Sequence, residues 1–259
     1  MKRIVYSIFT DNLDPGHKSS SDFKLSQFKK YKSELENAQR TYAESCGAEY
    51  KLFDTNNTAY DNIQFEKLLK FEELIDTYDE VLYLDFDVVP ITKINFFDVF
   101  DLNNICAYGI DRTPDNKKLK NSLKYDGFDF MNMYCKTCAK NAMLLLNNME
   151  GTDEIINTGV IGGNKKSISK LKINKRLNAL HSLLDEAKED NLYPQEIYKH
   201  WKYNNEIYFT YLIERYNIPY TNIGLQWNFL LDNYHPEVSS AGYFLHHVRK
   251  EFERSFGEK

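Results

Sequence analysis

Residues 81–90 constrain this chain most strongly, because an apolar run there ends in two carboxylates one residue apart. Side chains at positions i and i+2 of a strand point the same way, so Asp85 and Asp87 can share one small volume at a strand end. Carboxylates that close repel each other unless something positive lies between them. Mg²⁺ or Mn²⁺ is the expected partner, since both accept oxygen ligands and keep positions open for phosphates. The alternative is a solvated loop after a core strand.

The order of elements around this segment predicts an α/β fold. Strands are expected at residues 3–10, 49–53 and 81–84, with helices at 23–46 and 65–78 between them. This alternation is typical of a parallel sheet with helices on its faces. Ligands of such sheets bind beyond the carboxyl ends of the strands, which is where the two aspartates lie. Further along the chain we expect strands at 105–110, 155–163, 225–230 and 242–247, helices at 138–149, 169–190 and 206–216, and a charged loop at 111–125.

Composition excludes several classes of protein. The 259 residues carry a net charge of -5 without a basic block interleaved with aromatics, which argues against a nucleic-acid partner. No apolar run approaches the roughly 20 residues of a membrane helix, so we expect no integral membrane segment. The apolar run at residues 4–9 is too short for a signal peptide. Four cysteines (Cys46, Cys106, Cys135 and Cys138) fit a reducing compartment, and a cytoplasmic location is the expectation.

Polar groups near the C-terminus offer further ligands. His246 and His247 follow a short apolar run and precede Arg249 and Lys250. Neutral imidazole is a good Mn²⁺ ligand, and a cation after it can neutralise a diphosphate. The alternative is a surface histidine pair, and the sequence does not choose between the two rings.

Three other groups each allow a functional and a structural interpretation. Asn157 and Gly159 suit close contact with sugar hydroxyls, or they mark a β-bulge in a core strand. Residues 204–206 (Asn-Asn-Glu) place a carboxylate near a reacting carbon, or they cap a helix. Lys67 and Lys70 share one helix face, and they reach a nucleotide or form a solvated edge.

Taken together and in order, these segments resemble nucleotide-sugar-dependent glycosyltransferases of the GT-A fold, in particular the retaining group that contains glycogenin and bacterial lipopolysaccharide galactosyltransferases. Residues 78–89 are similar to the family's pattern around its DXD motif. Residues 157–160 resemble its Asn-Ala-Gly-Val strand, and residues 204–207 lie where the family has Asp-Gln-Asp. Residues 225–228 match a short strand ending in Asn, and His246 lies where the family has its metal-binding histidine.

The resemblance implies one GT-A-type, Rossmann-like domain over residues 1–259. Its central, mostly parallel sheet would have helices on both faces and a small antiparallel part near the C-terminus. Residues 1–100 would form the nucleotide-binding half, which ends in the DXD motif, and residues 101–259 the half for the donor sugar and the acceptor. The implied activity is transfer of a hexose from a nucleotide-sugar, with UDP-sugar as the expected donor, to an acceptor hydroxyl with retention. A saccharide, a protein and a lipid all stay open as acceptors.

The resemblance also implies roles for single residues. Asp85, Asp87 and His246 would hold Mn²⁺ or Mg²⁺, and Lys250 would contact the phosphates. The uracil and ribose would be bordered by Thr10, Asp11 and Asn12, with Lys67 nearby. Asn157, Asn205 and Glu206 would line the donor sugar, with Glu206 steadying positive charge on the anomeric carbon.

This chain departs from the family pattern in two places. Asn205 replaces the family's Gln and is one methylene shorter. The family's Gly after the metal-binding His and its Lys-Pro-Trp ending are absent, so residues 248–252 (Val-Arg-Lys-Glu-Phe) leave the phosphate contacts and the choice of histidine open.

Two other functions remain as alternatives. A haloacid-dehalogenase-like phosphatase also uses a strand ending in Asp-X-Asp, with the first Asp as nucleophile. That motif usually lies near the N-terminus, whereas here about 80 residues with an α/β pattern precede it. The other alternative is a catalytically silent relative that binds a nucleotide-sugar, although the intact pair Asp85 and Asp87 argues against it.

Overall fold

The computed structural model describes residues 1–9, 22–54, 63–111, 136–193, 197–198, 204–231 and 242–257. Its strands are β1 (Arg3–Phe9), β2 (Glu49–Asp54), β3 (Glu80–Leu84), β4 (Val88–Pro90), β5 (Ile105–Asp111), β6 (Glu154–Asn164), β7 (Tyr220–Asn222), β8 (Phe229–Leu230) and β9 (Phe244–His246). Its α-helices are α1 (Asp22–Ser45), α2 (Ile63–Glu73), α3 (Phe96–Val99), α5 (Lys165–Ile168), α6 (Ile173–Glu189), α8 (Asn205–Arg215) and α9 (Glu253–Phe256). Residues 136–145 are also helical, and 3₁₀ turns occur at η1 (Leu74–Asp76) and η2 (Leu225–Asn228).

The main sheet has six strands in the order β2-β1-β3-β6-β5-β7. β1 pairs in parallel with β2 and β3, and β5 pairs in parallel with β7. β6 lies in the middle and runs antiparallel to both of its neighbours, β3 and β5. The sequence prediction of an α/β fold with a central, mostly parallel sheet is therefore confirmed.

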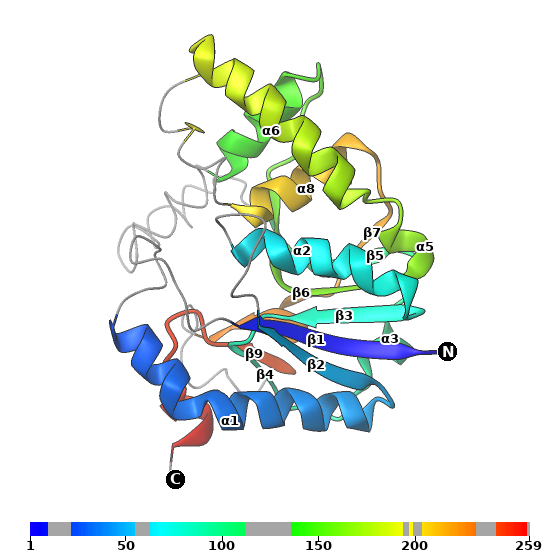
Figure 1. Cartoon of the computed structure of the whole chain (residues 1–259), viewed down its shortest axis with the longest axis vertical. Coiled ribbons are helices and arrows are strands. Elements are labelled where there is room, and N and C mark those ends of the chain that lie inside the picture. The colour runs from blue at the N-terminus through cyan, green and yellow to red at the C-terminus, as the bar shows by residue number, and fades with distance from the viewer. Residues whose placement is uncertain are drawn as a thin grey trace.

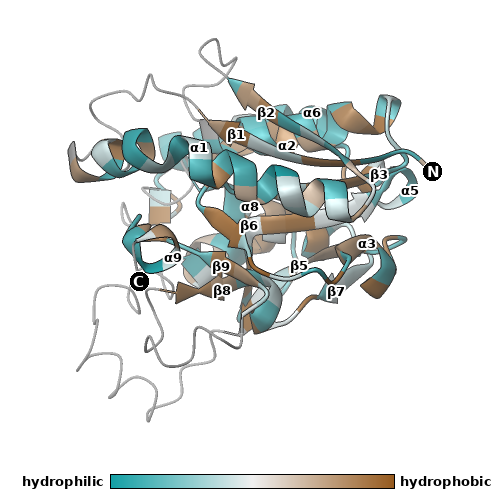
Figure 2. Ribbon diagram, turned by 90° about the horizontal axis from the view of Figure 1, so that it is seen from below, coloured by the Kyte–Doolittle hydropathy of each residue, from teal (hydrophilic) through white to brown (hydrophobic). Residues whose placement is uncertain are grey.

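Helices cover both faces of this sheet (Figure 1). α1 lies on one face, and α2, α6 and α8 lie on the other. Apolar residues concentrate on the strands, whereas α1 mixes apolar and hydrophilic residues, as the brown and teal ribbon of Figure 2 shows. This pattern is expected for strands that are buried on both faces and helices that are buried on one.

A second, three-stranded sheet has the order β4-β9-β8 and lies on the α1 side of the main sheet (Figure 1). β4 and β9 are antiparallel with Val88 opposite His246, while β8 and β9 are parallel. The small part expected near the C-terminus is present, and it also recruits β4 from the first half of the chain. Because β4 begins directly after Asp87, this pairing brings the C-terminal histidine to the acidic segment.

Most element boundaries agree with the sequence pattern, and the differences have local causes. α1 ends at Ser45, and Gly47 adopts a positive φ of 64°, the conformation that glycine allows at a helix end. The long helix expected over residues 169–190 begins only at Ile173, because Lys172 has a left-handed φ of 44°. Residues 225–228, expected as strand, form the 3₁₀ turn η2, and only Phe229 and Leu230 extend into β8.

Candidate functional site

The acidic segment forms a tight turn between β3 and β4. The Asp85 amide donates to the Gly159 carbonyl at 2.7 Å, and the Val88 amide donates to the Asp85 carbonyl at 2.9 Å. The fully buried Gln39 of α1 donates its side-chain amide to the carbonyls of Asp85 (2.9 Å) and Val88 (2.8 Å). Since each buried carbonyl needs a partner, Gln39 holds the turn against α1.

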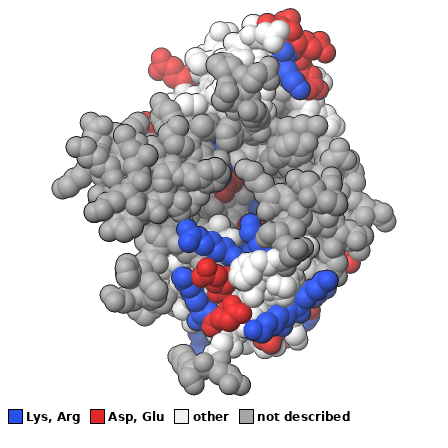
Figure 3. Space-filling model, turned by 90° about the vertical axis from the view of Figure 1, so that its left-hand side faces the viewer, with Lys and Arg blue, Asp and Glu red and all other residues white. Residues whose placement is uncertain are grey.

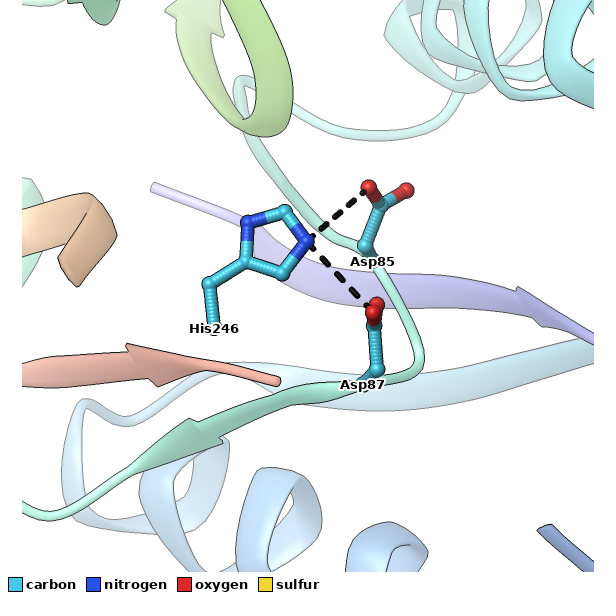
Figure 4. A group of neighbouring side chains, drawn as sticks. All are labelled: Asp85, Asp87 and His246. Carbon is cyan, nitrogen blue, oxygen red and sulfur yellow. Dashed lines mark ion pairs between the residues drawn. The ribbon is translucent and has the colours of Figure 1, made fainter. Parts of the chain in front are cut away.

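His246 lies opposite this turn on β9, and its ring points at both carboxylates (Figure 4). Its Nε2 atom is 3.8 Å from Asp85 Oδ2 and 3.5 Å from Asp87 Oδ2. One ligand atom from each of these side chains lies within 4.8 Å of the others. Asp87 is only 4% exposed, so the alternative of a solvated loop is wrong. The structure therefore brings together the three residues predicted to hold a metal.

The two adjacent histidines have different surroundings. His247 is fully buried, and its Nδ1 lies 3.1 Å from the Glu251 carbonyl while its Nε2 lies 2.8 Å from Ser255 Oγ. These contacts tie the segment that contains α9 to the end of β9. In the structure His246 faces the carboxylates and His247 faces the C-terminal segment, a distinction that the sequence left open.

Two lysines already neutralise the acidic pair. Lys67 Nζ donates to Asp85 Oδ1 at 3.0 Å, and Lys250 Nζ donates to Asp87 Oδ2. Burial alone would raise the pKa of Asp87, but the ammonium group of Lys250 outweighs it and holds that pKa well below its usual range. Both lysines thus lie at the acidic pair. Lys70, which shares the helix face, pairs with Glu73 instead.

A polar chain continues from the histidine toward α8. Asn157 Nδ2 donates to Glu206 Oε1 at 2.8 Å, and Lys136 Nζ donates to Glu206 Oε2. Asn228 Nδ2 donates to Asn157 Oδ1 at 2.7 Å, and Asn228 Oδ1 lies 2.8 Å from His246 Nδ1. The structure therefore connects the acidic turn to the first turn of α8 through side-chain hydrogen bonds.

The capping interpretation of the Asn-Asn-Glu segment is confirmed for Asn204. Asn204 is the N-cap of α8, and its side chain accepts from the amides of Glu206 and Ile207. Asn205 is 3% exposed and donates to Thr158 Oγ1 at 2.8 Å, so its amide ties α8 to β6. Glu206 is the member of the segment that joins the polar chain.

The bulge interpretation of Asn157 and Gly159 is confirmed. The register of β5 against β6 shifts from Ala107 opposite Ile161 to Tyr108 opposite Asn157. The extra residues of β6 include Gly159, whose amide donates to Asn157 Oδ1 at 2.9 Å. The irregularity thus fixes the Asn157 side chain in the polar chain.

Sequence reasoning missed three residues of this site. Gln39 and Lys136 gave no motif, because each depends on a contact with a segment far away in the sequence. Asn228 stood in a segment similar to the family pattern, but nothing linked it to His246. Thr10, Asp11 and Asn12, predicted to border the nucleotide, lie outside the described residues, as does almost all of the loop expected over residues 111–125.

The site lies at the edge of the sheet where β1 and β3 end, on the side of the molecule that Figure 3 shows. Basic and acidic groups lie next to one another on the described part of this face. Across the described ranges, no helix is long and apolar enough to cross a membrane.

Comparison with known proteins identifies the fold. No family model matches the chain, and no curated protein matches its sequence. Among solved structures, a glycosyltransferase involved in the glycosylation of the major capsid of PBCV-1 superposes with a TM-score of 0.51 and 12% identity, over 98% of each chain. The fold is a GT-A glycosyltransferase fold.

Two further solved structures are more distant. Mouse xyloside xylosyltransferase 1 has a TM-score of 0.43 and 12% identity, over 96% of this chain and 98% of that one. The galactosyltransferase LgtC, solved with donor and acceptor sugar analogues, has a TM-score of 0.41 and 14% identity, over 95% and 87%. At these scores neither adds to the assignment of the fold.

Proposed function

We propose that this chain is a metal-dependent glycosyltransferase that moves a hexose from a UDP-sugar to an acceptor hydroxyl with retention. The observation that carries the proposal is the cluster of Asp85, Asp87 and His246 at the carboxyl edge of β3, in a glycosyltransferase fold. Ligands of open α/β sheets bind at such an edge.

The side chains fit a hard divalent cation. Two carboxylates and one imidazole nitrogen suit Mn²⁺ or Mg²⁺, with Mn²⁺ favoured by the nitrogen ligand. Asp85, Asp87 and His246 would hold the ion, and the ion would supply positive charge against the negative charge that develops on a departing diphosphate.

The charges of the site favour binding the ion and a diphosphate together. The carboxylates of Asp85 and Asp87 are balanced by the ammonium groups of Lys67 and Lys250. A divalent cation alone would leave this buried site with excess positive charge, and a diphosphate alone would leave it with excess negative charge. Burying unbalanced charge is costly, so each ligand is expected to raise the affinity for the other.

Residues on β6 and α8 would act on the donor sugar. Asn157 and Glu206 would contact its hydroxyls, and the Glu206 carboxylate would steady positive charge on the anomeric carbon. The bond from that carbon to the diphosphate oxygen breaks, and a bond to the acceptor oxygen forms on the same face. The acceptor proton passes to the departing diphosphate, so no protein nucleophile is needed.

Calorimetry of UDP binding with and without Mn²⁺ tests the proposal. We expect Mn²⁺ to strengthen UDP binding to the natural chain but not to Asp87→Asn, while the control Asp101→Asn, at an exposed acid, binds like the natural chain. A panel of UDP-sugars would then show slow donor hydrolysis. Equal UDP affinity with and without Mn²⁺ would refute the metal site.

The two alternatives give different results in the same experiments. Metal-dependent UDP binding without turnover of any donor would favour a silent nucleotide-sugar-binding protein. Hydrolysis of a generic aryl phosphate that depends on Asp85 would favour a dehalogenase-like phosphatase, in which this residue is the nucleophile.

A further inference from the structure

The buried side chain of Asn228 has no role in the proposed chemistry, yet it lies directly behind a metal-site residue. It is fully buried at the end of the 3₁₀ turn η2, and its Oδ1 atom lies 2.8 Å from Nδ1 of His246. The opposite ring nitrogen, Nε2, faces Asp85 and Asp87. A neutral imidazole carries its proton on one nitrogen only, so whatever binds Nδ1 decides what Nε2 can do.

The backbone amide of Gly159 determines which end of the Asn228 side-chain amide is the nitrogen and which is the oxygen. A backbone N–H can only donate, and the Gly159 amide points at Asn157 Oδ1 at 2.9 Å. The oxygen of Asn157 is therefore an acceptor, and its Nδ2 donates to the carboxylate of Glu206. Because Asn157 Oδ1 can only accept, the Asn228 atom next to it at 2.7 Å is the amide nitrogen.

The remaining atom of the Asn228 amide, its oxygen, then faces His246. An amide oxygen can only accept, so the hydrogen bond to it requires a proton on Nδ1. In the neutral ring, Nε2 is left with a lone pair directed toward the two carboxylates. A lone pair on that nitrogen is what a metal ligand needs.

We propose that Asn228 is a positioning residue that fixes His246 in the Nδ1-protonated tautomer, with Nε2 ready to bind a cation. The backbone N–H of Gly159 sets this state through Asn157, so the bulge of β6 determines which ring nitrogen the site presents. The part of this inference that concerns the cation rests on the proposed function, whereas the tautomer does not.

The tautomer can be measured in the metal-free protein. A long-range ¹⁵N–¹H correlation spectrum distinguishes protonated from unprotonated ring nitrogens, and the His246 signal is identified by its loss in His246→Ala. We expect a proton on Nδ1 in the natural chain. Asn228→Leu, which keeps the branched shape but removes the acceptor, should lose this preference. Asn228→Asp keeps an oxygen acceptor beside Nδ1 and should retain it, although its second oxygen no longer donates to Asn157 Oδ1. Where Asn228→Leu does not fold, the position of the proton in the natural chain decides.

Metal affinity gives the second measurement. Mutation of a residue that orients a metal-binding histidine typically weakens metal binding by about 10- to 100-fold. We expect Mn²⁺ affinity in the presence of UDP to fall by that factor in Asn228→Leu and to fall less in Asn228→Asp, which keeps the acceptor for Nδ1 but loses the donor to Asn157. Asn104→Leu is the matched control, since it removes a 3.1 Å side-chain hydrogen bond to Thr221 next to the amino end of β5.

Either of two results would overturn the inference. One is a His246 ring in the natural metal-free chain that carries a proton on Nε2 and none on Nδ1. The other is Asn228→Leu with both the Nδ1 proton and the natural Mn²⁺ affinity intact. If the natural chain shows the Nδ1 proton but binds neither Mn²⁺ nor UDP, the proposed function fails while the role of Asn228 stands.

Discussion

Two glycines of β6 allow a sharp test of how tightly the site is packed. A Cβ atom at position 159 would lie 2.5 Å from His246 Cε1 and 2.7 Å from its Nδ1. A Cβ atom at position 162 would lie 2.3 Å from Cε1 of Phe96. Both substitutions to alanine thus push a methyl group into an aromatic ring from the same strand, but only one of these rings belongs to the site.

The size of the displacement follows from these distances. Carbon atoms in contact prefer about 3.5 to 4.0 Å, so the His246 ring must move by about 1 Å to accommodate Gly159→Ala. Metal sites tolerate deviations of only about 0.2 Å from their preferred distances. We therefore expect Gly159→Ala to weaken Mn²⁺ binding in the presence of UDP by at least about 10-fold, the lower end of losses seen when a ligand loses its support.

Both variants should lose stability to a similar extent. Forcing a methyl group into a packed interior typically costs about 1 to 3 kcal/mol of unfolding free energy, which urea denaturation measures. Gly162→Ala should show this loss with Mn²⁺ affinity unchanged. If Gly159→Ala also kept its Mn²⁺ affinity, the packing of His246 against this glycine would have no part in binding the ion.

Three further outcomes are expected. His246→Ala should abolish Mn²⁺-dependent UDP binding, whereas His247→Ala should lower the urea midpoint and leave that binding intact; the reverse result would exchange the roles of the two rings. Gln39→Leu should lower the free energy of unfolding by about 1 to 3 kcal/mol, because the Asp85 and Val88 carbonyls each lose a buried donor; an unchanged urea midpoint would contradict this. Burial raises the pKa of the Cys106 thiol to about 12, so at pH 8.5 it should resist iodoacetamide in the folded chain and react in urea. Rapid alkylation of Cys106 in the folded chain would refute the burial argument. Because the folded pKa of this thiol is raised above the usual value of about 8.5, the contribution of the thiol to stability should be lost as pH rises from about 9 toward 12.

The main sheet could be predicted because its strands are buried on both faces and read as short apolar runs. β3 is the clearest example, since all five of its residues are buried. The neighbourhood of Asp85 and Asp87 could also be predicted, although the two acids lie in a turn rather than on the strand itself. The alternation of side chains still holds there, because Phe86 between them packs into the apolar cluster around Tyr31 and Phe252.

The partners of the acids could be predicted only in part. His246 and Lys250 came from a family resemblance, and nothing in the sequence separates His246 from His247. The pairing of β9 with β4 makes that choice, because it is the register with Val88 opposite His246 that turns this ring toward the turn. Lys136 lies at the edge of a weakly patterned segment, and its contact with Glu206 depends on tertiary packing alone.

The direction of β6 explains why its candidate site residues lie near its start. Its neighbours β3 and β5 run the other way, so the carboxyl edge of the sheet, where ligands bind, meets the first half of β6. Asn157 and Gly159 fall at this edge, next to the end of β3, whereas Gly162 pairs with Leu82 inside the sheet and faces Phe96. Two glycines of one strand, only a few residues apart, thus differ in role because of strand direction, which periodicity alone does not reveal. The polar interruption of an apolar run indicates a site only once the direction of its strand in the sheet is known.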